Sequence, residues 1–189
     1  MRYSETHKAE TNQRILKEAS ERFRRDGIGA TGLQPLMKAL GLTHGGFYAH
    51  FKSKDDLVQQ ALRVAAGNLE ASTTELFAKD HPLARFIDVY LSTDHRARPD
   101  LGCPLPTMAA ELGQRGEPSP ITDEVVRSRL NSLEGTLSGP QASEQSVVIL
   151  SALVGALMLA RSVADPQLSD HLLQTAQHWL KQTFSAETV

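Results

Sequence analysis

The sequence has little of several residue types, and each shortage narrows what the chain can be. A single cysteine, Cys103, cannot form an internal disulfide, which fits a reducing compartment. The longest apolar run, residues 147–160, is shorter than the roughly 18–20 residues of a membrane span and predicts a buried core helix. The polar start has no apolar segment like that of a signal peptide. We therefore expect a cytoplasmic protein with no membrane segment.

Signatures of catalysis and of metal binding are also missing. No G-x-S-x-G, H-E-x-x-H or phosphate-cradling glycine loop occurs. His44 and His50 are six residues apart, which does not align them on one helix face, and no cysteine or carboxylate completes a zinc set. We expect no enzyme, no cofactor and no metal site.

Charge is unevenly distributed along the chain. The formal net charge is −2, but residues 1–63 carry 11 Lys and Arg against 7 Asp and Glu, and the remainder carries 9 against 15. A basic first third followed by an acidic body indicates a polyanionic partner at one end of the protein. Chance variation of the surface is the alternative explanation.

Almost every segment has helical periodicity, and no strand pattern or internal repeat appears. The sequence predicts an all-α protein of about nine helices, with a domain at residues 1–53 and a larger bundle at 54–189. The expected helices cover residues 12–26, 33–40, 44–50, 54–77, 82–92, 107–112, 120–137, 142–164 and 166–185, whereas 93–106 is expected to be a loop.

The two short helices at 33–40 and 44–50 are joined by a turn through Gly41, and the helix before them can brace the pair. This is the outline of a helix-turn-helix, whose second helix enters the DNA major groove. Thr43 is the expected N-cap of that second helix, and Ser53 with Asp56 forms a capping box for the next. An aromatic pair four residues apart, Phe47 and Phe51, is expected to face the core.

The stretch from Thr31 to Leu57, "TGLQPLMKALGLTHGGFYAHFKSKDDL", resembles the DNA-binding signature of TetR-family transcriptional regulators. It departs from the family pattern at Gly32, Pro35 and His44. The positions that match are Thr31, Gly41, Thr43, Gly45, Tyr48, His50, Phe51, Lys54 and Leu57.

The resemblance implies DNA contacts from this stretch, which we assign by side-chain chemistry. Phosphate contacts set affinity and register, and base contacts set specificity. Expected phosphate contacts are Thr31, Thr43, Tyr48, His50, Lys52 and Lys54, although both threonines also have sufficient roles as helix caps. Expected base contacts are Gln34, His44, Gly45 and Gly46, where the glycines allow close approach of the backbone.

The resemblance further implies a dimer and a ligand site in the body. The interface is expected on the last two helices, at Ser151, Ala152, Gly155, Ala156, Leu172, Ala176 and Leu180. Candidate ligand-binding residues are Phe86, Tyr90, Cys103, Met108, Leu112, Leu153 and Met158, for each of which plain core packing is the alternative. Cys103 is either a structural cysteine or a sensor of electrophiles and oxidants.

Two functions of different classes follow from these observations. The first is a ligand-responsive repressor that binds a palindromic double-stranded DNA operator as a homodimer and is released by a small apolar or electrophilic inducer. The second is an all-α small-molecule carrier or enzyme whose helix-turn-helix is only structural. The basic motif and the lack of catalytic signatures favour the first.

Overall fold

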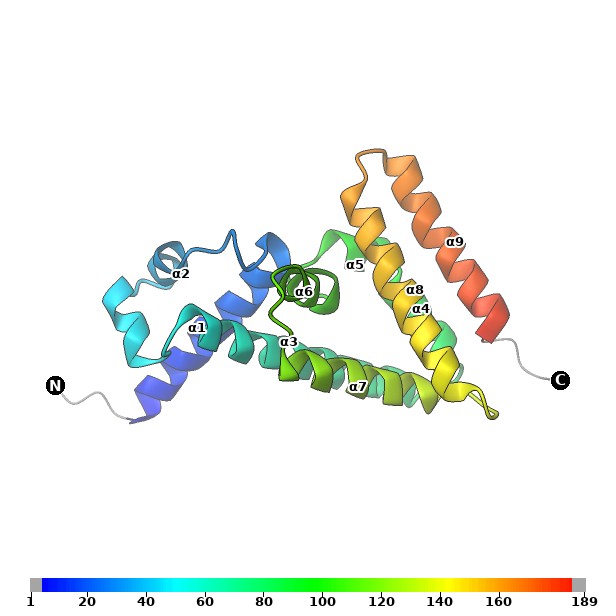
Figure 1. Cartoon of the computed structure of the whole chain (residues 1–189), viewed down its shortest axis with the longest axis horizontal. Helices are drawn as coiled ribbons and strands as arrows, with labels where there is room; N and C mark the ends of the chain where they lie inside the picture. Colours follow the sequence, from blue (N-terminus) through cyan, green and yellow to red (C-terminus); the bar gives the residue numbers. More distant parts are fainter. Residues whose placement is uncertain (1–4, 185–189) are drawn as a thin grey trace. The chain divides into compact units, whose positions relative to one another are not determined.

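The computed structural model describes residues 5–184, and within them every regular element is a helix (Figure 1). The all-α prediction is therefore confirmed, and the predicted final residue of the last helix, 185, lies outside the described residues. The elements are α1 (Glu5–Asp26), α2 (Leu33–Ala39), the 3-10 helix η1 (His44–Ala49), α3 (Lys54–Phe77), α4 (Pro82–Tyr90), α5 (Thr93–Ala97), the π-helix η2 (Leu105–Ala109), α6 (Ala110–Gln114), α7 (Pro120–Glu134), α8 (Ala142–Ser162) and α9 (Pro166–Phe184).

These elements form two compact units. The first is Met1–Gly67 with Pro99–Ile121, and the second is Asn68–Arg98 with Thr122–Val189. The predicted domain boundary after residue 53 thus lies inside the first unit, which also takes the first part of α3 and the segment that contains η2 and α6.

The first unit is built around α1, whose buried residues Ile15, Ala19 and Phe23 recur every four positions and so share one face. The helix ends where Gly27 takes a φ of +90°, a conformation that favours glycine.

Arg24, near that end, is 3% exposed, and its guanidinium donates a 2.9 Å hydrogen bond to the carbonyl oxygen of Gly102. Burial lowers the pKa of Arg24, and the nearby Glu21, Asp100 and Cys103 act in the opposite direction.

In the second unit, α8 and α9 lie side by side, and α4 packs against α9 (Figure 1). The cap predicted for α9 is present, since the Asp165 carboxylate accepts a 2.8 Å hydrogen bond from the amide of Gln167. The short helix α5 replaces part of the predicted loop at 93–106. It begins because the Ser92 hydroxyl caps the amide of His95 at 3.1 Å, a signal that the following prolines obscure in the sequence.

Helix α8 contains the apolar run of residues 147–160. Among the described helices it alone has the length and hydropathy of a membrane-spanning segment, properties that the core helix of a globular protein shares. Its inner face, including Ile149, Leu153 and Leu157, is fully buried. Large apolar side chains nevertheless remain exposed along α8 and α9 of the single chain, at Val147, Val148, Met158, Leu159, Leu168 and Trp179.

Candidate DNA-binding surface

The helix-turn-helix is held by an aromatic core. Phe47 and Phe51 are both buried, as the sequence predicts, and their rings stack with centroids 5.4 Å apart. Leu36 and Met37 of α2 are fully buried in the same unit. Because η1 rests on these rings, its outward residues keep a fixed position relative to α2.

The turn between α2 and η1 is closed from two sides. Gly41 has a φ of +71°, which explains why glycine occupies the turn. Arg14 of α1 donates a 3.2 Å hydrogen bond to the carbonyl oxygen of Leu40, one of the acceptors that the end of α2 leaves without a helical partner. The Arg14 contact was not predicted, because nothing in the sequence pairs a residue of α1 with a position 26 residues later.

The second helix of the motif is a 3-10 helix, not the α-helix usual for this position, and covers His44–Ala49. Thr43 caps it as predicted, since its hydroxyl accepts a 3.2 Å hydrogen bond from the amide of Gly46. A β-carbon added at Gly45 would meet nothing within 4 Å, and one added at Gly46 would meet only the Thr43 hydroxyl at 3.4 Å. The fold of the free chain therefore does not require glycine at either position.

Tyr48 is the most exposed of the large hydrophobic side chains that the structure describes, at 62%. Its ring is braced edge-on by Phe47, with centroids 5.2 Å apart, and by His44, with centroids 6.0 Å apart. The ring is thus supported by two neighbours while the side chain stays exposed. Gln34, His44, Gly45 and Lys52 are also exposed around it.

The start of α3 carries the predicted capping box. The Ser53 hydroxyl accepts a 3.1 Å hydrogen bond from the amide of Asp56, and the Asp56 carboxylate accepts one of 2.9 Å from the amide of Lys52. This second bond, with another from Gln60, holds the pKa of Asp56 below its ordinary value. The box fixes the backbone that carries Lys52 and Lys54 toward the motif.

Three predicted phosphate contacts are less exposed than the others, namely Thr31, Lys54 and the half-buried His50. Thr31 is 5% exposed, and its hydroxyl donates a 2.7 Å hydrogen bond to the carbonyl oxygen of Gly27. It does not cap α2, because Gly32 is the N-cap of that helix and no side chain caps it. Lys54 is half-buried. Burial lowers its pKa, as does the nearby Arg115, while Glu111 and Asp55 oppose that shift.

A carboxylate clamp on the loop before α2 was not predicted. Glu111 of α6 accepts hydrogen bonds from the amides of Ile28, at 2.5 Å, and Gly29, at 2.7 Å, and it also pairs with Arg115. Burial raises the pKa of Glu111, but these three donors outweigh it, and the pKa lies below its ordinary value. The loop that leads into α2 is thus tied to α6 within the first unit.

The residues predicted to bind a ligand are distributed between the units. Cys103, Met108 and Leu112 are buried in the first unit, and Phe86, Tyr90 and Leu153 are buried in the second. Met158 is 44% exposed and so belongs to the exposed apolar residues of α8 and not to a buried site in the single chain.

The second unit has an aromatic cluster around Phe86. The Phe86 ring lies 5.2 Å from that of Phe77 and 5.6 Å from that of Tyr90, and the Arg129 guanidinium lies 5.3 Å above it. His95 meets Tyr90 edge-on at 4.8 Å. Burial lowers the pKa of His95, the backbone oxygen of Tyr90 opposes that shift, and Arg161 adds to it.

The residues predicted for a dimer interface differ in exposure. Ser151 is exposed, Leu180 is buried in the single chain, and the others, Ala152, Gly155, Ala156, Leu172 and Ala176, are half-buried. The exposed apolar residues of α8 and α9 lie on the same two helices. The interface stays a prediction.

The braced tyrosine, the capped turn and the aromatic core define a helix-turn-helix protein of the DNA-binding class. Residues 15–61 match the model of a family described as bacterial regulatory proteins, tetR family. This match covers the DNA-binding part of the chain and, with the fold around it, supports a regulator of the tetR family.

Comparisons with individual proteins agree with this family. The transcriptional regulator AcrR of Shigella flexneri is 37% identical over 70 residues, which are 37% of this chain and 33% of AcrR, so the match spans a third of that relative. The transcriptional repressor BepR of Brucella suis biovar 1 is 24% identical over 183 residues, covering 84% of this chain and 83% of BepR. The crystal structure of reduced NemR from E. coli has a TM-score of 0.77 at 20% identity, covers 95% of this chain and 100% of NemR, and shows the fold alone.

Proposed function

We propose that the chain is a cytoplasmic transcriptional repressor that binds a palindromic DNA operator as a homodimer and leaves it when a small molecule binds the body. The observation that carries the DNA-binding part is the exposed side chain of Tyr48, whose ring is held by Phe47 and His44. A rigid donor of this kind suits a phosphate oxygen, because it does not have to be ordered on binding.

Base contacts are assigned to Gln34, His44, Gly45 and Gly46, which surround Tyr48 on the same motif. The free space above Gly45 supports this assignment, since the fold itself does not call for glycine there. Phosphate contacts are assigned to Thr43, Tyr48, His50, Lys52 and Lys54. Thr31 contributes indirectly, through its hydrogen bond to the carbonyl oxygen of Gly27 in the loop before α2.

The dimer is supported by the exposed apolar side chains of α8 and α9, such as Leu159 and Trp179. Apolar side chains clustered on one pair of helices are typical of an interface.

The role as a repressor is supported by BepR, which is named a transcriptional repressor. For the inducer, the buried aromatic cluster around Phe86 suits an apolar molecule with a polar group within reach of Arg129.

Fluorescence anisotropy with duplexes from the region upstream of the protein's own gene tests the proposal. We expect tight binding whose affinity falls steeply as salt rises. Tyr48→Phe should weaken binding by more than about tenfold, because each protomer of the dimer loses a hydrogen bond to a charged oxygen worth about 1.5–3 kcal/mol, with an unchanged melting temperature. Absence of duplex binding at low salt would instead favour a carrier or enzyme with a structural helix-turn-helix.

A further inference from the structure

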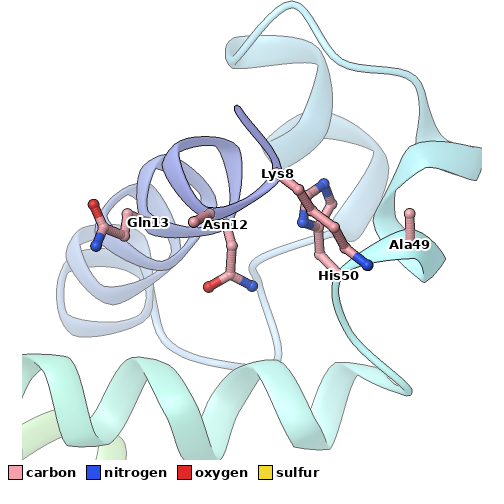
Figure 2. Close-up of a pocket in the computed structure, with 6 residues that line it drawn as sticks. Lys8, Asn12, Gln13, Ala49 and His50 are labelled. Carbon is pink, nitrogen blue, oxygen red and sulfur yellow. The ribbon is translucent and has the colours of Figure 1, made fainter. Parts of the chain in front are cut away.

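An open pocket of about 400 Å³ lies between the beginning of α1 and the end of η1. Its lining consists of Lys8, Ala9, Asn12, Gln13, Ala49 and His50. Figure 2 shows the side chain of Lys8 beside the His50 ring, Asn12 one helical turn further along α1, and Gln13 directed away from them. Since a water molecule takes about 30 Å³ of liquid volume, this space holds a phosphate group together with several waters.

The pocket gathers hydrogen-bond donors and positive charge. Lys8 contributes an ammonium group and Asn12 an amide. The Nδ1 atom of His50 is buried and has no hydrogen-bond partner among the described residues. A buried ring nitrogen of this kind costs free energy unless something satisfies it.

No described carboxylate balances these charges. Lys8 and His50 form no ion pair with any side chain that the structure describes, and the carboxylate of Glu10 lies 4.0 Å from the His7 ring. Burial lowers the pKa of His50, and repulsion by Lys8 lowers it further. Among the side chains that the structure describes, these two basic groups therefore have no counterion.

The exposed Tyr48 is two residues before His50, so a strand of DNA contacted by Tyr48 passes near the pocket. We propose that the pocket binds a backbone phosphate of DNA, with Lys8 and Asn12 of α1 as phosphate-contacting residues in addition to His50. The inference rests on the proposed DNA-binding function and extends its footprint from the helix-turn-helix to the first turns of α1.

The test compares two charge reversals on the same helix. Lys8→Glu removes the ammonium from the pocket. Lys17→Glu changes the net charge equally, but Lys17 is exposed nine residues further on, which is about 180° around the helix and so on the opposite face. Asn12→Asp is the second pocket variant, since it replaces a donor by a nearly isosteric negative charge.

Binding of each variant to a mixed-sequence duplex is measured between 50 and 200 mM salt, because phosphate contacts do not depend on sequence. Each lost phosphate contact lowers the salt slope by about 0.9, and a dimer loses two. For Lys8→Glu we expect the salt slope of the affinity to be smaller by about 1.8 than that of the parent. The ratio of the parent's affinity to the variant's affinity should therefore fall about tenfold between 50 and 200 mM salt. Asn12→Asp should weaken binding at low salt, and Lys17→Glu should keep the parental slope.

The outcomes separate the two levels of the proposal. A parent protein that binds no duplex overturns the DNA-binding function and this pocket with it. A parent that binds, with equal slopes for Lys8→Glu and Lys17→Glu, overturns the pocket alone. Inorganic phosphate is the other source of the same chemistry: if millimolar phosphate shifts the His50 ring signals in NMR while both slopes stay parental, the site serves free phosphate and not DNA.

Discussion

The contact of Glu111 with the loop before α2 permits a quantitative prediction. In Glu111→Gln, one carboxylate oxygen becomes an amide nitrogen, which faces a backbone N–H as donor against donor. Hydrogen bonds to a charged group contribute about 1.5–3 kcal/mol each. The side chain is 23% exposed, so water replaces part of the loss. We therefore expect a loss of about 2 kcal/mol in the free energy of unfolding.

For a chain of this length, 2 kcal/mol corresponds to a fall of about 4–8 °C in the melting temperature. Urea unfolding at pH 7 and fixed protein concentration measures the difference, since oligomerisation makes stability depend on concentration. Glu117→Gln is the matched control, because Glu117 lies on the same unit and is exposed. Equal stabilities of the two variants would refute the reasoning.

The same contact predicts a pH dependence. The pKa of Glu111 is depressed in the folded protein, so its ionised form contributes fully above the unfolded value of about 4.3 and its contribution is lost as the pH falls through the lower, folded value. The stability gap between the parent and Glu111→Gln should thus be largest at neutral pH and narrow below about pH 4. A gap that widens on acidification would contradict the assignment.

Further predictions concern the surface, the interface and the thiol. Gly45→Ala should leave the melting temperature unchanged or slightly raised, because its β-carbon meets nothing within 4 Å, while Gly46→Arg should alter the preferred sequence in an operator selection; an unaltered preference would leave Gly46 without a role in readout. Leu159→Glu should shift the protein toward monomer in analytical ultracentrifugation, whereas Val89→Glu, on an equally exposed residue of α4, should not. Cys103, 1% exposed, should resist thiol reagents in the native protein and react fully in denaturant; fast native reaction would favour a sensor role.

The elements set by local chemistry were predictable from the sequence. The Thr43 cap, the capping box of Ser53 and Asp56, and the stops at Gly27 and Gly41 each involve residues a few positions apart, and all are present. The burial of both Phe47 and Phe51 was predictable from their spacing of four residues, which the hydrogen bond from the amide of Phe51 to the carbonyl oxygen of Phe47 preserves beyond the end of η1.

Features formed between distant residues were not predictable in this way. Glu111 accepts hydrogen bonds from the amides of Ile28 and Gly29, which lie more than 80 residues earlier in the sequence. The pocket of Lys8 and His50 is formed by two separate elements, and no sequence periodicity predicts that they lie close together. The 3-10 geometry of η1 also escapes prediction, because a span of six residues has too few turns to distinguish helix types by pattern.

The length of α1 has a mechanical consequence for the first unit. Near its beginning, Lys8 and Asn12 line the pocket, and near its end the guanidinium of Arg24 is bonded to Gly102. The 16 residues from Lys8 to Arg24 span about 24 Å at 1.5 Å per residue. A continuous helix acts as a lever over this distance, and a tilt of about 5° at the Arg24 end displaces Lys8 by about 2 Å. A displacement of that size exceeds the tolerance of a hydrogen bond.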